Sequence, residues 1–85
     1  MRAVHEDTLM RESALVGEAR GALMRGDSKA ALAALDATKT LKHRELEPEE
    51  LSLEAKALRA MGREGDAASL EIVLKSRYPD HALAR

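Results

Sequence analysis

Two segments of the chain carry the same pattern of small residues and glycine. The first reads EARGALMRGDSKAALAALD at residues 18–36, and the second reads EAKALRAMGREGDAASLEI at residues 54–72. A shift of 36 residues superimposes Ala19 on Ala55, Gly26 on Gly62, and Ala31 on Ala67. Small side chains midway along two helices let the helices cross at close range. The pattern therefore predicts two successive helical hairpins.

The composition favours helices and a single domain. Eighty-five residues suffice for one hydrophobic core, and the 16 Ala and 13 Leu are strong helix formers. Seven residues are β-branched and one is aromatic, so the chain has little material for a sheet. We expect an all-α fold made of two antiparallel helix-turn-helix hairpins.

Charge, cysteine content and hydropathy limit the classes of function. Fourteen basic and 15 acidic residues give a net charge of −1, which disfavours nucleic acid as a partner. Without cysteine there is no disulfide framework or thiolate site, so cytoplasm and periplasm both stay open as locations. No apolar run approaches the roughly 20 residues of a membrane span, and residues 1–7 lack a signal-peptide core. We expect no membrane insertion by this segment.

Glycine and proline mark the ends of four predicted helices. Gly26 and Gly62 follow the first and third helices, because glycine is the common residue just past a helix end. Pro48 occupies the first position of the third helix, and Pro79 ends the fourth. The predicted helices span about residues 7–25, 28–42, 48–61 and 64–77. A capping helix is expected to begin in residues 80–85.

The first helix has two unusual features. Its predicted core face, at spacings of three and four, consists of Leu9, Glu12, Val16, Ala19 and Leu23. Gly17 and Gly21 lie in the helix interior, where each costs about 1 kcal/mol relative to Ala. We therefore expect either close approach of another backbone or deep burial at both glycines. The methionines, Met10, Met24 and Met61, are expected to fill the core or an interface.

The matched positions resemble the tetratricopeptide repeat. That family has a small residue in the first helix, Gly before the turn, Ala early in the second helix, and Pro at the end of the unit. The corresponding residues are Ala19, Gly26 and Ala31 in unit one, and Ala55, Gly62, Ala67 and Pro79 in unit two. Unit one has His43 where Pro is usual, and the family's large aromatics are absent. The chain is also similar to repeat tails of bacterial envelope and regulatory proteins.

The resemblance covers about residues 12–85 and implies a short right-handed solenoid. Unit one would span about residues 8–43 and unit two about residues 48–79, with residues 80–85 as the start of the capping helix. Because two repeats are fewer than the roughly three that usually form a stable array, extra packing is expected. It would come from the N-terminal turn, from a homodimer partner, or from the rest of a longer protein.

The same resemblance implies a concave groove lined by the first helices of the two units. The candidate partner-binding residues there are Val16, Arg20, Leu23, Met24, Lys56 and Arg59, with Ser13, Glu49, Ser52 and Ala60 beside them. A basic stripe next to an apolar patch could receive an acidic or amphipathic peptide or helix. In the alternative interpretation the apolar part packs internally and the basic part is only solvated.

The titratable residues give no pattern typical of catalysis or metal binding. The carboxylates of the third helix and its approach are expected to be solvated and to compensate the helix dipole: Glu45, Glu47, Glu49, Glu50 and Glu54. The histidines lie 38 residues apart and lack the spacing of metal ligands, so a solvated or capping role is expected for His5, His43 and His81. We predict no catalytic, cofactor-binding or metal-binding residues.

Taken together, these observations predict a non-enzymatic protein–protein interaction or scaffold module, part of a larger bacterial regulatory or envelope protein. Two alternatives stay open. One is a small helical regulator associated with DNA or a sigma factor, which the lack of Asn, Gln and a basic helix face disfavours. The other is a homo-oligomerising four-helix bundle.

Overall fold

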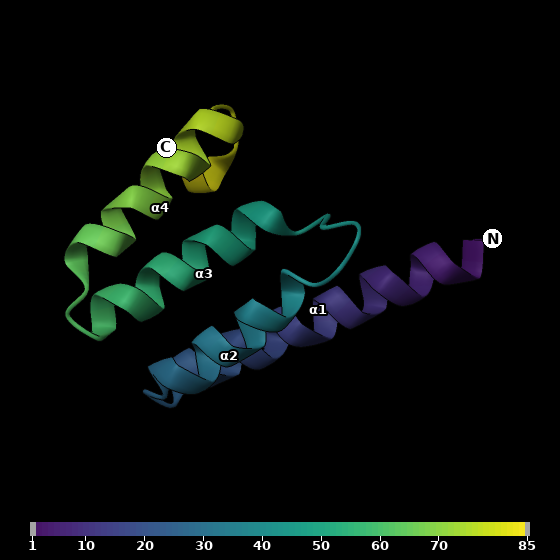
Figure 1. Cartoon of the computed structure of the whole chain (residues 1–85), viewed down its shortest axis with the longest axis horizontal. Coiled ribbons are helices and arrows are strands. Elements are labelled where there is room, and N and C mark those ends of the chain that lie inside the picture. The colour runs from purple at the N-terminus through teal and green to yellow at the C-terminus, as the bar shows by residue number, and fades with distance from the viewer. Residues whose placement is uncertain (1, 85) are drawn as a thin grey trace.

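The structure, a computed structural model, describes residues 2–84 of the chain and the side chains of residues 7–84. Within this range the regular structure is entirely helical (Figure 1). The elements in order are α1 (Arg2–Met24), α2 (Ser28–Thr38), α3 (Glu47–Ala60), α4 (Glu64–Arg77) and the short 3-10 helix η1 (Ala82–Ala84). The expectation of an all-α fold is confirmed.

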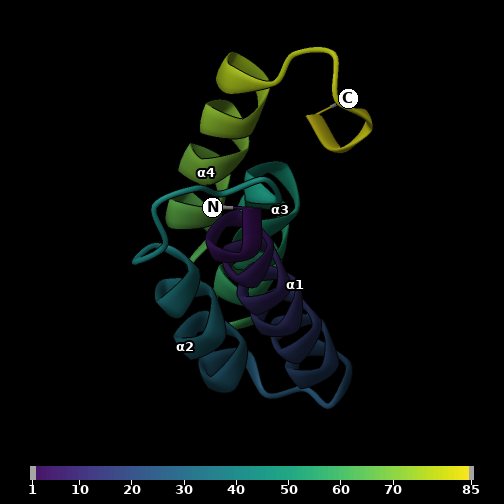
Figure 2. The same cartoon turned by 90° about the vertical axis from the view of Figure 1, so that its right-hand side faces the viewer.

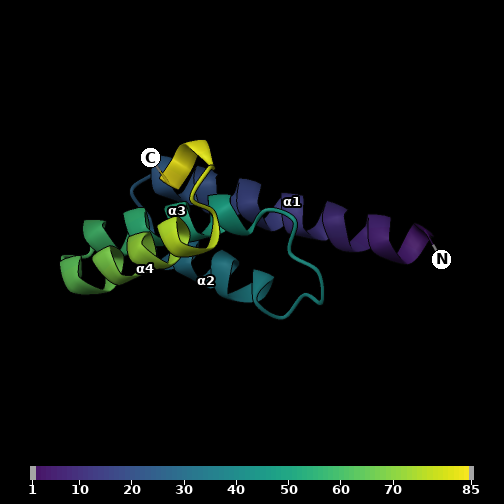
Figure 3. The same ribbon diagram turned by 90° about the horizontal axis from the view of Figure 1, so that it is seen from above.

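The helices pack as two hairpins that contact each other through α3, the first helix of the second hairpin. Helix α1 packs against α2, and α3 packs against α4. Helix α3 also contacts α2 and, over a smaller area, α1, whereas α4 touches neither α1 nor α2 in the described part of the chain. Helix η1 folds back onto α3 and α4, on the side of α3 that α1 also flanks (Figures 2 and 3).

The turns of the two hairpins have the same backbone geometry. Gly26 and Gly62 have φ values of 78° and 79°, a left-handed conformation that favours glycine. In both turns the residue after the glycine donates its N–H to the carbonyl five positions earlier, at 2.8 Å. The shift of 36 residues that relates the two sequence segments therefore also relates the backbones of the two turns.

Helix α2 is shorter than predicted, ending at Thr38 instead of near Lys42. The Thr38 hydroxyl donates to the carbonyl of Leu35 at 2.6 Å, and the Thr40 hydroxyl donates to the carbonyl of Ala37 at 2.8 Å. Hydroxyl groups that bond to nearby carbonyls compete with the helical backbone pattern. The connector between the hairpins is consequently longer than expected, and it spans residues 39–46.

The core consists largely of small residues at the helix crossings. Five alanines have no exposed surface at all: Ala19, Ala22, Ala31, Ala57 and Ala67. They pack with larger side chains, among which Leu35 and Leu58 are 1% and 6% exposed. Leu9, predicted to face the core, is 37% exposed, because the N-terminal part of α1 extends beyond α2 (Figure 3).

The interior glycines and the methionines of α1 do not serve the core as predicted. A Cβ added to Gly17 would meet no atom within 4 Å, and one added to Gly21 would meet only the guanidinium of Arg25, at 3.5 Å. Met10 and Met24 are 70% and 85% exposed. The expectations of a close backbone at the glycines and of core filling by these methionines are wrong for the isolated chain.

Alanine substitutions should have opposite effects at Gly17 and Gly62. In dilute solution, Gly17→Ala is expected to stabilise the fold by about 1 kcal/mol, because alanine is the better helix former and its Cβ meets nothing. Gly62→Ala is expected to destabilise it by about 1 kcal/mol or more, because φ is positive there. Urea unfolding followed by circular dichroism measures both, and equal effects at the two positions would contradict this account.

Candidate functional site

Some of the predicted groove residues do come together, at a small hollow between α1 and α3. The hollow has a volume of about 80 Å³ and is lined by Arg20, Glu49, Ser52, Leu53, Lys56 and Leu83. We call it the α1–α3 hollow. Arg20 comes from the first hairpin and Lys56 from the second, and both side chains are exposed. Leu83 of η1 closes one side, a contribution that sequence reasoning missed because it depends on how the C-terminal turn folds back.

Two other predicted residues lie away from this hollow. Val16 is 3% exposed and belongs to the core, because it lies on the side of α1 that faces α2 and α3. Arg59 is bonded to two carboxylates on α4: its Nε donates to Glu64 at 2.8 Å, and its two terminal nitrogens donate to Glu71 at 2.9 and 3.0 Å. These bonds raise the pKa of Arg59 further. The predicted basic stripe therefore reduces to Arg20 and Lys56.

The predicted apolar patch is also divided. Leu23 is half-buried and packs against the core. Met24, at the C-terminal end of α1, is the more exposed of the two, with 85% of its surface accessible. Neither residue lines the α1–α3 hollow. The hollow thus joins two cations, Arg20 and Lys56, and one carboxylate, Glu49, to the aliphatic side chains of Leu53 and Leu83 instead.

A larger groove lies between α2, α3 and α4, at a place that no sequence pattern indicated. It has a volume of about 400 Å³, and its apolar lining consists of Leu32, Leu58, Leu70 and Val73. The acidic residues at its rim are paired: Lys39 bonds Glu54 at 3.0 Å and Asp36 at 3.4 Å, and Arg63 bonds Asp66 at 2.8 Å. The groove exists because α4 leans away from α2 (Figure 1). The relative orientation of these two helices is a property of the tertiary structure, so no local sequence pattern predicts it.

The third notable feature is a buried carboxyl pair, Glu12 and Glu50, between α1 and the start of α3. Glu12 has no exposed surface. Its two oxygens accept the backbone N–H groups of Glu45 and Leu46, at 2.9 and 3.0 Å. Leu46 is the N-cap of α3 and has no side chain that could cap the helix. Glu12 therefore provides acceptors for the start of α3 from the other hairpin.

Glu50 is the second member of this pair and is 1% exposed. Burial, followed by the neighbouring carboxyl of Glu12, raises the pKa of Glu50 to about 7, whereas the neighbouring Arg44 acts in the opposite direction. Arg44 donates from Nε to one Glu50 oxygen at 2.9 Å, and the other oxygen, Oε2, is buried without a hydrogen-bond partner. A proton on Oε2 would satisfy this atom and could be donated to Glu12.

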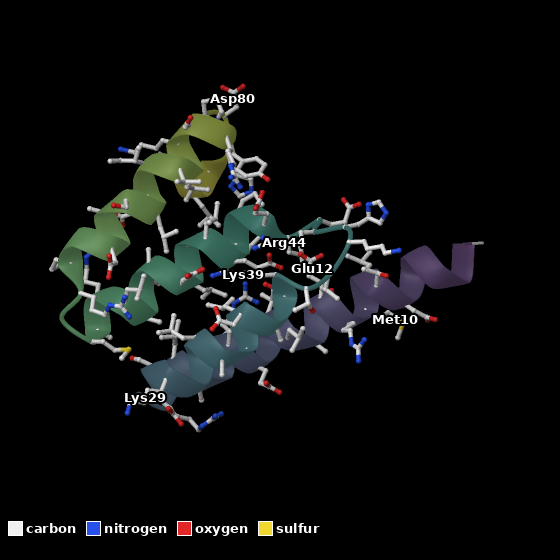
Figure 4. All side chains as sticks on the ribbon, in the orientation of Figure 1. Met10, Glu12, Lys29, Lys39, Arg44 and Asp80 are labelled. Carbon is white, nitrogen blue, oxygen red and sulfur yellow. The ribbon has the colours of Figure 1, made fainter. Side chains whose placement is uncertain are left out.

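Additional polar contacts connect this pair to α4. Arg44 also approaches Glu47, with an Nη1–Oε2 distance of 3.4 Å. Glu47 in turn accepts from Arg77 at 2.9 Å and from the Tyr78 hydroxyl. The hydrogen bond to Glu47 raises the pKa of Tyr78. Figure 4 shows Glu12 and Arg44 close together between α1 and α3, so the polar cluster joins α1, the connector and both helices of the second hairpin.

The prediction that Glu50 is a solvated, dipole-compensating residue is wrong, because the side chain is buried. Paired carboxylates can serve as acid and base in catalysis. Neither Glu12 nor Glu50 lines the α1–α3 hollow, the larger groove, or two further hollows among the described residues, one beside Leu41 and one beside Lys75. The arrangement suits a structural bond between the two hairpins.

The remaining titratable residues show no metal-ligand geometry. Among the described side chains no group of three or more His, Asp or Glu is placed to hold an ion. His81 accepts the N–H of Leu83 through Nδ1 at 3.1 Å, and thus caps the C-terminal turn. His43 also takes part in a polar interaction, and His5 lies outside the described side chains. None of the helices in residues 2–84 is both long and apolar enough to cross a membrane.

Comparisons of the chain with protein-family models, with curated proteins and with solved structures give no match in any of the three.

Proposed function

We propose that this chain is a non-enzymatic protein–protein interaction module of the tetratricopeptide-like class, which binds an acidic amphipathic segment at the α1–α3 hollow. The observation that carries the proposal is the meeting of Arg20 and Lys56, from two different hairpins, beside Leu53 and Leu83. Two cations next to apolar side chains match a ligand that has carboxylates next to apolar residues.

The charges of the other basic residues on α3 strengthen this choice of surface. Arg59 is occupied by Glu64 and Glu71, whereas Lys56, one turn earlier on α3, has no ion-pair partner among the described residues. The same holds for Arg20 on α1. The cations at the hollow are therefore available to a ligand without the loss of an existing ion pair.

The repeat-like geometry supports the class of module. The two turns have the same φ at glycine and the same 2.8 Å hydrogen bond, and the matched alanines are buried in both hairpins. In a solenoid, side chains from successive units line one continuous binding surface. The buried acid pair would fix the relative position of α1 and α3 and hence the distance between Arg20 and Lys56.

The proposal is tested by titrating the protein with a helical peptide composed of leucine and glutamate. We expect the largest amide chemical-shift changes at Arg20, Ser52 and Lys56. Lys56→Glu should weaken binding about tenfold, because the substitution replaces the attraction between Lys56 and the glutamates of the peptide with a repulsion. Lys29→Glu is the matched control, since Lys29 is an exposed cation at the start of α2, away from the hollow (Figure 4).

Two outcomes would contradict the proposal. One is shift changes that map to the α2–α4 groove, around Leu32 and Leu70, instead of the α1–α3 hollow. The other is an equal loss of affinity in Lys56→Glu and in Lys29→Glu, which would show that only the net charge of the protein matters. Circular dichroism of each variant verifies that helicity is retained.

A further inference from the structure

The side of α1 that faces away from the core is an unpartnered surface with a regular composition. The buried residues Glu12, Val16 and Ala19 lie on the opposite side of the helix. At alternating spacings of four and three, the outer side carries Met10, Ala14, Gly17, Gly21 and Met24. We call these residues the outer face of α1. No described element covers this face (Figure 2).

Two properties of the outer face have no explanation in the contacts within a single copy of the chain. Met10 and Met24 are 70% and 85% exposed, and Met10 points away from the rest of the molecule (Figure 4). Gly17 has no neighbour within 4 Å of where its Cβ would lie. Exposed methionines beside interior helix glycines are typical of a face that another helix contacts closely.

The charges along one edge of this face indicate which helix contacts it. In chain order they are Asp7, Arg11, Glu18 and Arg25, which alternate acidic and basic. All four side chains are exposed, and none has an ion-pair partner within residues 7–84. When such a series is placed beside a second copy that runs in the opposite direction, each acidic residue faces a basic one. A second copy of α1 in antiparallel orientation therefore sets acid opposite base along the whole edge.

We propose that the outer face of α1 is a homodimer interface, in which two copies of this chain pack α1 against α1 in antiparallel orientation. With the two-fold axis between Ala14 and Gly17, Met10 of one copy lies over Gly21 of the other, beside the guanidinium of Arg25 that flanks this glycine. Arg11 of one copy then lies near Glu18 of the other, and Asp7 near Arg25. The symmetry produces each of these contacts twice.

A single pair of helices gives an interface at the small end of the range for specific complexes. We therefore expect a reversible dimer with a dissociation constant of about 100 μM. This face is separate from the α1–α3 hollow, since none of the residues that line the hollow belongs to it. Dimerisation and binding of an acidic segment are independent properties, and either can fail while the other holds.

Sedimentation equilibrium between about 10 μM and 1 mM tests the dimer. The wild type should shift from the mass of one 9.3 kDa chain towards that of two. Arg11→Glu and Glu18→Arg should each weaken association about tenfold, because each puts like charges opposite one another. The double variant Arg11→Glu/Glu18→Arg should restore it. Lys29→Glu, on α2, is the control and should leave association unchanged.

Disulfide formation tests the orientation, because the chain has no cysteine of its own. When a Met10→Cys variant and a Gly21→Cys variant are mixed and oxidised, the mixed disulfide should form faster than either like pair. A wild type that remains monomeric at 1 mM would overturn the proposal. So would a double variant that fails to restore association, or preferential formation of the Met10→Cys like pair.

Discussion

Replacing Glu12 with alanine is expected to lower the free energy of unfolding by about 3 kcal/mol or more. The substitution leaves the N–H groups of Glu45 and Leu46 without their acceptors in a partly buried place, and each such loss costs up to about 1–3 kcal/mol. Domains of this size are stable by only about 5–15 kcal/mol in total. The loss of Glu12 should therefore remove a large share of the stability.

Two further variants separate this explanation from a general loss of volume. Glu12→Gln keeps the shape of the side chain and one acceptor oxygen, so it should cost about half as much as Glu12→Ala. Glu18→Ala, an exposed change on the same helix, should cost less than about 0.5 kcal/mol. Urea unfolding at pH 6 measures all three, and equal stabilities for Glu12→Ala and Glu18→Ala would refute the role of Glu12 at the junction.

The second large effect is a pH dependence that arises from Glu50. Its pKa in the folded state is about 7, above the ordinary value of 4.5, so the folded protein holds this proton more tightly than the unfolded chain. The corresponding stability is fully present below about pH 4.5 and is lost as the pH rises through 7. A shift of this size corresponds to about 3 kcal/mol between the two limits.

The variant Glu50→Gln isolates this contribution. Glutamine is neutral at all pH values, and it can donate to Glu12 while it accepts from Arg44. Unfolding measured from pH 5 to pH 8 should show a fall in wild-type stability that the variant lacks, with the variant the more stable protein at pH 8. If wild type and Glu50→Gln have parallel pH profiles, Glu50 does not titrate in this range.

The hairpins could be predicted from sequence because their signals are local. Glycine just past a helix end and matched alanines at the crossings act through neighbouring residues, so Gly26 and Gly62 predicted both turns correctly. The early end of α2 was missed because it depends on the hydroxyls of Thr38 and Thr40, which bond to nearby carbonyls instead of continuing the helix.

The buried acid pair was missed for a different reason. The hydrogen bonds of Glu12 join residues 33 and 34 positions apart, and their geometry depends on the path of the connector. One signal was available: Glu12 was the charged residue on an otherwise apolar stripe, and such residues are rarely buried without a partner. A helix start at Leu46, which has no capping side chain, was a possible partner.

The candidate groove was predictable in part. The resemblance to the tetratricopeptide repeat implied that Arg20 and Lys56 line a groove between the first helices of two hairpins, and the structure has both at the α1–α3 hollow. Spacing could not determine the rotation of each helix, which turns Val16 into the core. It could not anticipate that Glu64 and Glu71 of α4 would occupy Arg59. Leu83 lines the hollow because the C-terminal turn folds back onto α3, which the spacing of residues also could not predict.

The central structural claim is that a buried acid pair joins the two hairpins and thereby fixes the surface that Arg20 and Lys56 share. The most direct test is an NMR titration of the Glu50 side-chain carboxyl carbon in the wild-type protein. We predict a midpoint near pH 7, as burial beside Glu12 requires. A midpoint near the ordinary value of 4.5 would show that Glu50 is solvated, and would contradict the account.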